Sequence, residues 1–186
     1  MHSPWLSLSV AALAALAVPQ AVAACGDKLV VLGRGVRFER IIESEYPGTI
    51  VLYLNPRSRL PAADEQFHLS SVLELAGHTV LLAKSRAELE RSLREEPADL
   101  VLADIVDARS LSAELTATPA APVVLPVLYK PTDAELAEAQ RQTACLGQAA
   151  KRKRGQLLRT VESLLERRAK GLPTGCGEET DARSGA

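Results

Sequence analysis

The sequence is poor in aromatic residues and cysteines, and each shortage excludes a class of protein. Aromatic residues make up 3% of the 186 residues, so nothing indicates a surface for stacking nucleic-acid bases. Three cysteines are too few for a scaffold built on disulfides, and no Cys/His spacing is typical of a zinc site. A formal net charge of -1 excludes a basic module that binds nucleic acid. The fold must therefore be held together by a hydrophobic core, formed from the 47% of residues that are hydrophobic.

Charged side chains are missing from the first 24 residues, which indicates an export signal. Residues 6–18 form an apolar run that is too short to span a bilayer comfortably. Residues 21–23 (Ala-Val-Ala) follow it and match the small-x-small pattern that signal peptidase cleaves. The pattern predicts a signal peptide over residues 1–23 and a protein that is periplasmic or secreted.

A second cleavage site lies one residue later. Residues 22–25 (Val-Ala-Ala-Cys) resemble a lipoprotein box, in which Cys25 is acylated and becomes the first residue of the mature chain. The protein would then be a lipoprotein anchored to a membrane through Cys25. Residues 21–23 are the cleaner site, and soluble export is the favoured interpretation. No later segment approaches the length of a membrane span, so no transmembrane segment is expected in the mature chain.

Beyond the signal, short apolar runs alternate with amphipathic segments. The expected strands are 28–32, 50–54, 78–83, 99–105 and 123–129, with a weaker one within 143–150. The expected helices are 38–46, 63–76, and four more that are marked by a capping box at 85–88, by Leu111 and Leu115, by a capping box at 132–135, and by an apolar stripe from Leu157 to Leu165. Five βα units predict an α/β, doubly wound, parallel five-stranded sheet of the flavodoxin-like type, preceded by an extra N-terminal strand and short helix.

One residue conflicts with this pattern. Pro126 lies within the expected strand 123–129 and has no backbone N–H to donate. Proline is confined to edge strands and bulges in most sheets. We therefore expect this strand to end early or to bulge.

Part of the chain resembles the receiver domain of bacterial two-component response regulators. The match is best at residues 73–80 (LELAGHTV), at the following residues 83–89, and at residues 99–105 (DLVLADI). In the family these are the end of the first helix with the second strand, then the second helix, and then the third strand. The resemblance covers about two-thirds of the chain. It implies a receiver-like domain at 49–170, between an N-terminal extension at 24–48 and a flexible tail at 171–186.

The resemblance also assigns positions to the chemistry of receivers. In the family, an acidic pair holds Mg²⁺, an aspartate accepts the phosphoryl group, and a hydroxyl and a lysine complete the site, because metal and cation offset the gathered negative charge. Asp104 matches the phosphoacceptor, but Leu54 and Asn55 stand where the acidic pair belongs, and Val127 stands at or near the hydroxyl position. Lys151 is nearest to the lysine position. A degenerate receiver with no metal, no cofactor and an inactive Asp104 follows, and Asp104 would then simply cap the next helix.

The sequence also allows a second register. Lys130-Pro131 is similar to the pair that follows the fifth strand of receivers, but that register leaves no fourth βα unit and too much chain afterward. We therefore assign 123–129 to the fourth strand and Lys130 to a loop. The acidic pair is absent in either register.

Two classes of function follow. The favoured hypothesis is an exported, non-catalytic, degenerate receiver-like domain that acts as a protein-interaction module, with an unknown protein partner in the cell envelope and no nucleic-acid partner. The alternatives are a small-ligand-binding protein or enzyme at the C-terminal edge of the sheet, or a receiver still phosphorylated on Asp104. The pocket of the small-ligand alternative would be lined by Asn55, Arg57, Asp104, Asp107 and Lys130.

The three cysteines allow three single pairings, and each pairing leaves one cysteine over. We favour a disulfide between Cys25 and Cys145, because both stand beside expected ordered elements, and this leaves Cys176 in the tail. If Cys25 is acylated, a bond between Cys145 and Cys176 is the only one left.

Overall fold

The computed structural model describes residues 27–31, 38–115, 121–150 and 153–174. The expected signal peptide, Cys25, Lys151 and Cys176 lie outside these ranges, so the predictions about them stay predictions. The strands are β1 (Asp27–Val31), β2 (Phe38–Ile42), β3 (Thr49–Tyr53), β4 (Thr79–Ala83), β5 (Leu100–Asp104), β6 (Val123–Tyr129) and β7 (Gly147–Ala149). The helices are α1 (Leu60–Phe67), α2 (Leu69–Leu75), α3 (Arg86–Glu95), α4 (Ile105–Leu115), α5 (Asp133–Gln142) and α6 (Arg154–Ala169).

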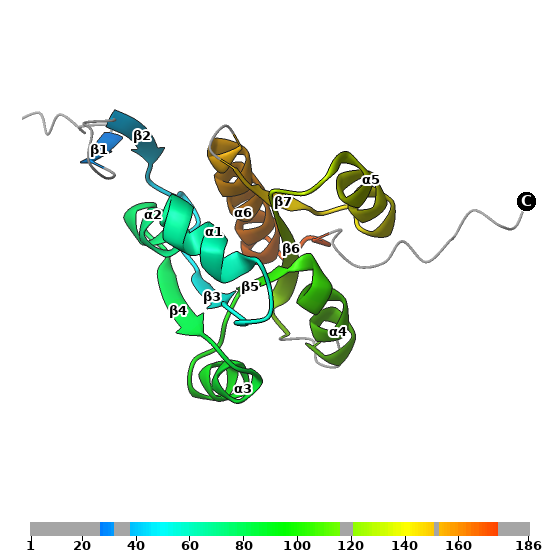
Figure 1. The fold of residues 1–186 in the computed structure, drawn as a ribbon. Coiled ribbons are helices and arrows are strands. Elements are labelled where there is room, and N and C mark those ends of the chain that lie inside the picture. The colour runs from blue at the N-terminus through cyan, green and yellow to red at the C-terminus, as the bar shows by residue number, and fades with distance from the viewer. Residues whose placement is uncertain (1–26, 32–37, 116–120, 151–152, 175–186) are drawn as a thin grey trace, which may run out of the picture.

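Five of the strands form one parallel sheet. Their order is β4-β3-β5-β6-β7, and each strand pairs in parallel with its neighbours (Figure 1). Counted within this sheet, the order is 2-1-3-4-5, which confirms the predicted doubly wound, flavodoxin-like α/β fold. The carboxyl ends of β3, β5 and β6 therefore lie side by side, at the edge where such folds place their ligands.

The sheet is covered on both faces. On one face, α1, α2 and α6 pack against alternate residues of the central strands, among them Ile50, Leu52, Leu100, Leu102, Leu125 and Val127. On the other face, α3 and α4 pack against Val51, Val101, Ala103 and Val124. The predicted stripe of α6 is confirmed, since Leu157, Val161, Leu164 and Leu165 are all buried. Burial on both faces explains why β3 and β5 are continuous apolar runs.

The expected short helix at 38–46 is wrong. Residues Phe38–Ile42 form β2, which pairs antiparallel with β1 in a two-stranded sheet separate from the main one (Figure 1). The β-branched pair Ile41 and Ile42 favours an extended chain, and a helix over 38–46 would leave about four N–H and four C=O groups without partners inside the helix. Pairing with β1 satisfies those groups instead.

The helix expected over 63–76 is divided in two. His68 adopts a left-handed conformation (φ 51°), so α1 ends there and α2 begins immediately afterward. The Asp64 carboxylate accepts a hydrogen bond of 2.8 Å from the backbone N–H of Ser70, which stabilises the start of α2. Gly77 has a φ of 97° and follows α2, in the left-handed conformation expected of a residue that ends a helix.

β6 neither ends early nor bulges at Pro126. The strand runs from Val123 to Tyr129, and Pro126 pairs in register with Ala103 of β5. The pairing of β6 with β7 starts only at Val127, opposite Gly147. The Pro126 carbonyl oxygen lies on the β7 side, 3.5 Å from where a Cβ on Gly147 would stand. The N–H that proline lacks would point the same way, to a place where β7 has not yet begun, so no ladder hydrogen bond is lost.

Candidate functional site

Asp104 lies at the carboxyl end of β5 and connects two helices. Its Oδ2 accepts a hydrogen bond of 3.0 Å from the backbone N–H of Arg59, the residue that caps α1. Its Oδ1 accepts one of 3.1 Å from the backbone N–H of Val106, in the first turn of α4. The residue is only 4% exposed. Both carboxylate oxygens therefore satisfy backbone donors at helix starts, as expected for a structural cap.

The neighbouring positions carry different chemistry from that of receivers. Leu54 is buried in the core, and Val127 is fully buried. Asn55 donates a hydrogen bond of 2.8 Å from its amide nitrogen to Asp107 Oδ1, and its amide oxygen accepts one of 3.1 Å from the backbone N–H of Arg57. These three positions provide neither a metal-binding carboxylate nor a hydroxyl. The carboxylate that Asn55 does bind, that of Asp107, comes from α4.

The Asp107 carboxylate is only partly satisfied. Its Oδ2 is buried and has no hydrogen-bond partner within the described residues. Burial raises the pKa of Tyr53, the negative charge of Asp107 raises it further, and Arg86 lowers it. Asp107 thus places a negative charge beside the end of β3, and no cation from the described part of the chain binds it directly.

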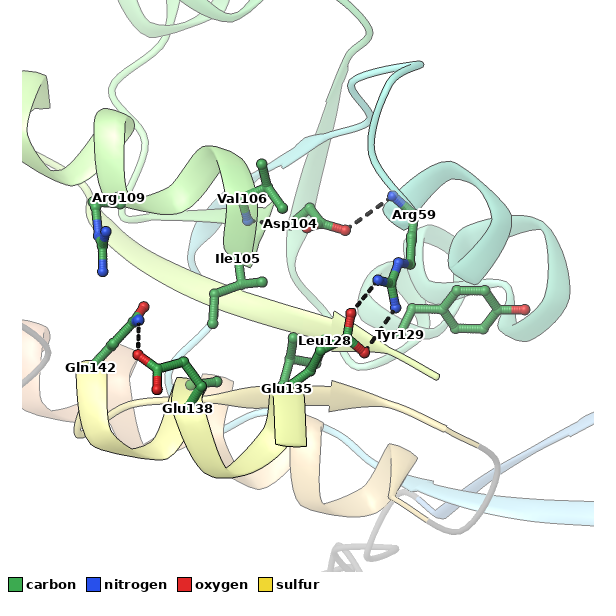
Figure 2. A pocket seen from close by; sticks show the side chains of 11 residues that line it. Arg59, Asp104, Ile105, Val106, Arg109, Leu128, Tyr129, Glu135, Glu138 and Gln142 are labelled. Carbon is green, nitrogen blue, oxygen red and sulfur yellow. Dashed lines mark hydrogen bonds and ion pairs between the residues drawn. The ribbon is translucent and has the colours of Figure 1, made fainter. Parts of the chain in front are cut away.

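The Arg59 guanidinium binds the Glu135 carboxylate. The two groups form an ion pair through both carboxylate oxygens, and Glu135 also accepts a hydrogen bond of 2.7 Å from the backbone N–H of Thr132 (Figure 2). The capping box predicted at residues 132–135 is confirmed by the reciprocal bond from the Glu135 N–H to the Thr132 hydroxyl. The hydrogen bond from Arg59, followed by that from Thr132, lowers the pKa of Glu135 to about 2. Asp104, Arg59 and Glu135 thus connect the starts of α1, α4 and α5.

A cavity of about 390 Å³ lies between α4 and α5, above the end of β6. It is lined by Arg59, Asp104, Ile105, Val106, Arg109, Leu128, Tyr129, Glu135, Glu138, Ala139 and Gln142 (Figure 2). Of the five residues predicted to form a pocket, Asp104 lines this cavity, whereas Asn55, Arg57, Asp107 and Lys130 are not part of its lining. Lys130 follows β6 in a left-handed conformation (φ 47°), and its ammonium lies 4.8 Å from the centre of the Tyr129 ring.

Sequence reasoning missed most of the charged residues of this cavity. Glu135 was recognised only as part of a capping box, and nothing in the sequence indicates its partner Arg59, which lies 76 positions earlier. Arg109 and Glu138 are at ordinary surface positions of amphipathic helices. The sequence indicated the place of the site only indirectly. Doubly wound folds bring the carboxyl ends of their strands to one edge of the sheet, and a site is expected there.

Cys145 precedes β7 and is partly buried. Its sulfur lies 3.9 Å from the carbonyl oxygen of Thr174, on the segment that follows α6. Cys25 and Cys176 both lie outside the described residues, so the predicted pairing of Cys25 with Cys145 stays a prediction.

Neither a metal centre nor a membrane-crossing helix occurs in the described part of the chain. No group of three or more His, Cys, Asp or Glu side chains there is placed to hold a metal ion. No helix in these ranges has the length and apolar character that crossing a bilayer requires.

The chain was compared with models of protein families, with curated proteins and with solved structures, and no match was found. The topology of the sheet and the geometry of this site are therefore the basis for inferring its function.

Proposed function

We propose that this chain is an exported, non-catalytic receiver-like module that binds another protein of the cell envelope. The observation that carries the proposal is the position of the Asp104 carboxylate. Each of its oxygens accepts a backbone N–H, one at the start of α1 and one at the start of α4, and the residue is buried. A carboxylate used in this way is a structural part of the fold, not a group presented to a phosphoryl donor.

The residues around Asp104 support the same conclusion. Phosphoryl transfer to a carboxylate requires a metal ion and a cation, because negative charge gathers on the transferred group. Asn55 and Leu54 provide no ligand set for Mg²⁺, which is bound through carboxylates in such sites. Arg59, whose backbone N–H binds Asp104 at the start of α1, already has its guanidinium paired with Glu135. A phosphoryl group on Asp104 would therefore add charge that Leu54, Asn55 and the paired Arg59 do not offset.

The exported location rests on the uncharged first 24 residues alone. Export favours the non-catalytic role, because phosphate donors of high transfer potential are cytoplasmic. It is also consistent with a disulfide at Cys145, since disulfides persist in oxidising compartments. The receiver-like domain is proposed to span residues 49–170, after an extension at 24–48 that contains β1 and β2.

Titration with Mg²⁺ and beryllofluoride, an analogue of the phosphoryl group, tests the non-catalytic role. We expect no change in the thermal midpoint and no shift of the Val106 amide resonance, which reports on the Asp104 carboxylate. Saturable binding that disappears in Asp104→Asn would overturn the proposal. Asp133→Asn, at an exposed position in the first turn of α5, is the matched control for loss of one carboxylate.

The interaction role needs a direct test of its own. The mature chain is used to capture proteins from an envelope extract, and each captured protein is then purified and titrated against the chain. Saturable binding to one purified envelope protein is the expected result. If no captured protein binds when purified, the interaction module is the wrong class of function.

A further inference from the structure

Helix α5 buries fewer side chains than helix α6 does. Ala139 is its only fully buried residue, whereas α6 buries four aliphatic side chains. The start of α5 is held by its capping box and by the ion pair between Arg59 and Glu135. Little apolar side chain therefore extends from α5 toward α4, and the cavity of about 390 Å³ lies between them.

The walls of this cavity are mostly apolar. Ile105 of α4, Leu128 of β6 and Ala139 of α5 line it. Val106 lines it as well and is 80% exposed, so its side chain is accessible to solvent. The volume lies within the range of small-molecule sites, which are typically apolar with a few charged groups that fix the orientation of the ligand.

Most of the charged groups in the cavity already have partners. Glu135 pairs with Arg59, and both oxygens of Asp104 accept backbone hydrogen bonds. Glu138 pairs with Arg141 and Gln142, whose hydrogen bonds lower its pKa. The lining carboxylates therefore do not need a cation from outside.

Arg109 is the exception among these groups. Its guanidinium forms no hydrogen bond or ion pair with the described residues, and it acts on Glu138 only through its charge. Figure 2 shows Arg109 and Arg59 on opposite sides of the cavity, with Ile105 and Val106 between them. A guanidinium with free donors binds a carboxylate through two parallel hydrogen bonds.

We propose that the cavity binds a small amphiphilic carboxylate. The carboxylate of the ligand pairs with Arg109, and its aliphatic chain lies against Ile105, Leu128 and Ala139. A cationic amphiphile fits less well, because its charge would lie near Arg109 while the neighbouring carboxylates are already paired. This site is separate from the proposed protein-interaction role and does not depend on it.

Octanoate is the probe for this site, titrated into the purified chain by calorimetry and by amide resonances of α4 and α5. We expect one saturable site. Octanol, which lacks the charge, and octylammonium, which reverses it, are each expected to bind about tenfold more weakly, since loss of a charge-assisted pair has this magnitude. Absence of saturable octanoate binding at millimolar concentration, or equal binding of the three probes, overturns the proposal.

Variants of Arg109 and Val106 test whether octanoate binds in this cavity. Arg109→Gln should weaken octanoate binding about tenfold, whereas Arg57→Gln, which removes an exposed arginine outside the cavity, should not change it. Val106→Trp places a bulky ring at an exposed position of the cavity wall, so it should block binding without unfolding the chain. The far-ultraviolet circular dichroism of each variant verifies the fold. Unchanged octanoate affinity in both Arg109→Gln and Val106→Trp contradicts this location of the site and leaves the proposed protein interaction untouched.

Discussion

The carboxylate of Asp104 lies 3.0 Å from the backbone nitrogen of Arg59, which precedes it by 45 positions. This contact joins the end of β5 to the start of α1, and the second oxygen joins it to the start of α4 through Val106. Arg59 then extends the connection to α5 through Glu135. The residue that matches a phosphoacceptor in sequence thus contacts two helix starts directly, and Arg59 connects it to a third.

Replacing Asp104 should therefore cost stability. In Asp104→Ala, the N–H groups of Arg59 and Val106 both lose their acceptor, and loss of such a cap costs about 1–3 kcal/mol of unfolding free energy. Urea unfolding followed by circular dichroism measures the loss. Asp133→Ala removes an exposed carboxylate from the first turn of α5 and should cost clearly less. Equal losses in the two variants would mean that the Asp104 hydrogen bonds do not stabilise the fold.

The carboxyl group of Glu135 should titrate with a pKa of about 2, well below its ordinary value of 4.5. Because the folded state holds this group in its charged form, its contribution to stability is complete above 4.5 and is lost as the pH falls through about 2. Carboxyl carbon NMR during an acid titration measures the midpoint. Arg59→Gln removes the largest cause and should raise the pKa, whereas Arg57→Gln should leave it unchanged. An unchanged midpoint in Arg59→Gln would show that the ion pair does not form in solution.

His78 should make the fold sensitive to mild acid. The residue is 6% exposed, its Nδ1 has no hydrogen-bond partner within the described ranges, and burial lowers its pKa below 6.5 while the charge of Glu162 opposes this. Below 6.5 the unfolded chain therefore binds more protons than the folded chain, so stability decreases as the pH falls.

Urea midpoints measured at about pH 7 and about pH 5 test this pH dependence. The decrease should be smaller in His78→Gln, which cannot titrate. His68→Gln, at the exposed turn between α1 and α2, is the control and should behave as the unmodified chain does. Identical decreases in the unmodified chain and in His78→Gln would exclude His78 as the cause.

The position of Thr174 favours a disulfide between Cys145 and Cys176. The carbonyl oxygen of Thr174 lies 3.9 Å from the Cys145 sulfur, and the two residues from Thr174 to Cys176 span at most about 7 Å. Such a bond would close a loop of about 30 residues and stabilise the fold by about 3.7 kcal/mol through the lost entropy of the unfolded chain. Mass spectrometry of the proteolysed, nonreduced protein identifies the pair. A bond between Cys25 and Cys145 would instead support the pairing that the sequence favoured, and would exclude acylation of Cys25.

Sequence patterns within a few residues predicted the elements whose structure depends on neighbouring residues. The stripe of α6, the capping box of α5 and the apolar runs of β3 and β5 each carry their pattern within a few residues. The division of one expected helix at His68 was missed, because a left-handed histidine has no side-chain signature. The strand β2 was mistaken for a helix, because its identity depends on pairing with β1.

The candidate site was harder to predict for a different reason. Its position at the carboxyl ends of the strands follows from the topology, and Asp104 was recognised there. The ion pair of Arg59 with Glu135, and the lack of a partner for Arg109 among the described residues, depend on how far α5 lies from α4. That separation is decided by packing among residues distant in sequence, which periodicity does not encode.

Pro126 has one further consequence, for the alignment of β7. If β7 slipped toward the start of β6, a β7 carbonyl would face the proline ring in place of a donor, and that pairing would lose a hydrogen bond. The same slip would displace Gly147, where a Cβ would stand 2.6 Å from Leu157 Cδ1 of α6, so a residue with a side chain would clash there. Pro126 therefore disfavours one wrong register of β7. Gly147 leaves room for Leu157 of α6 only when β7 is in the correct register.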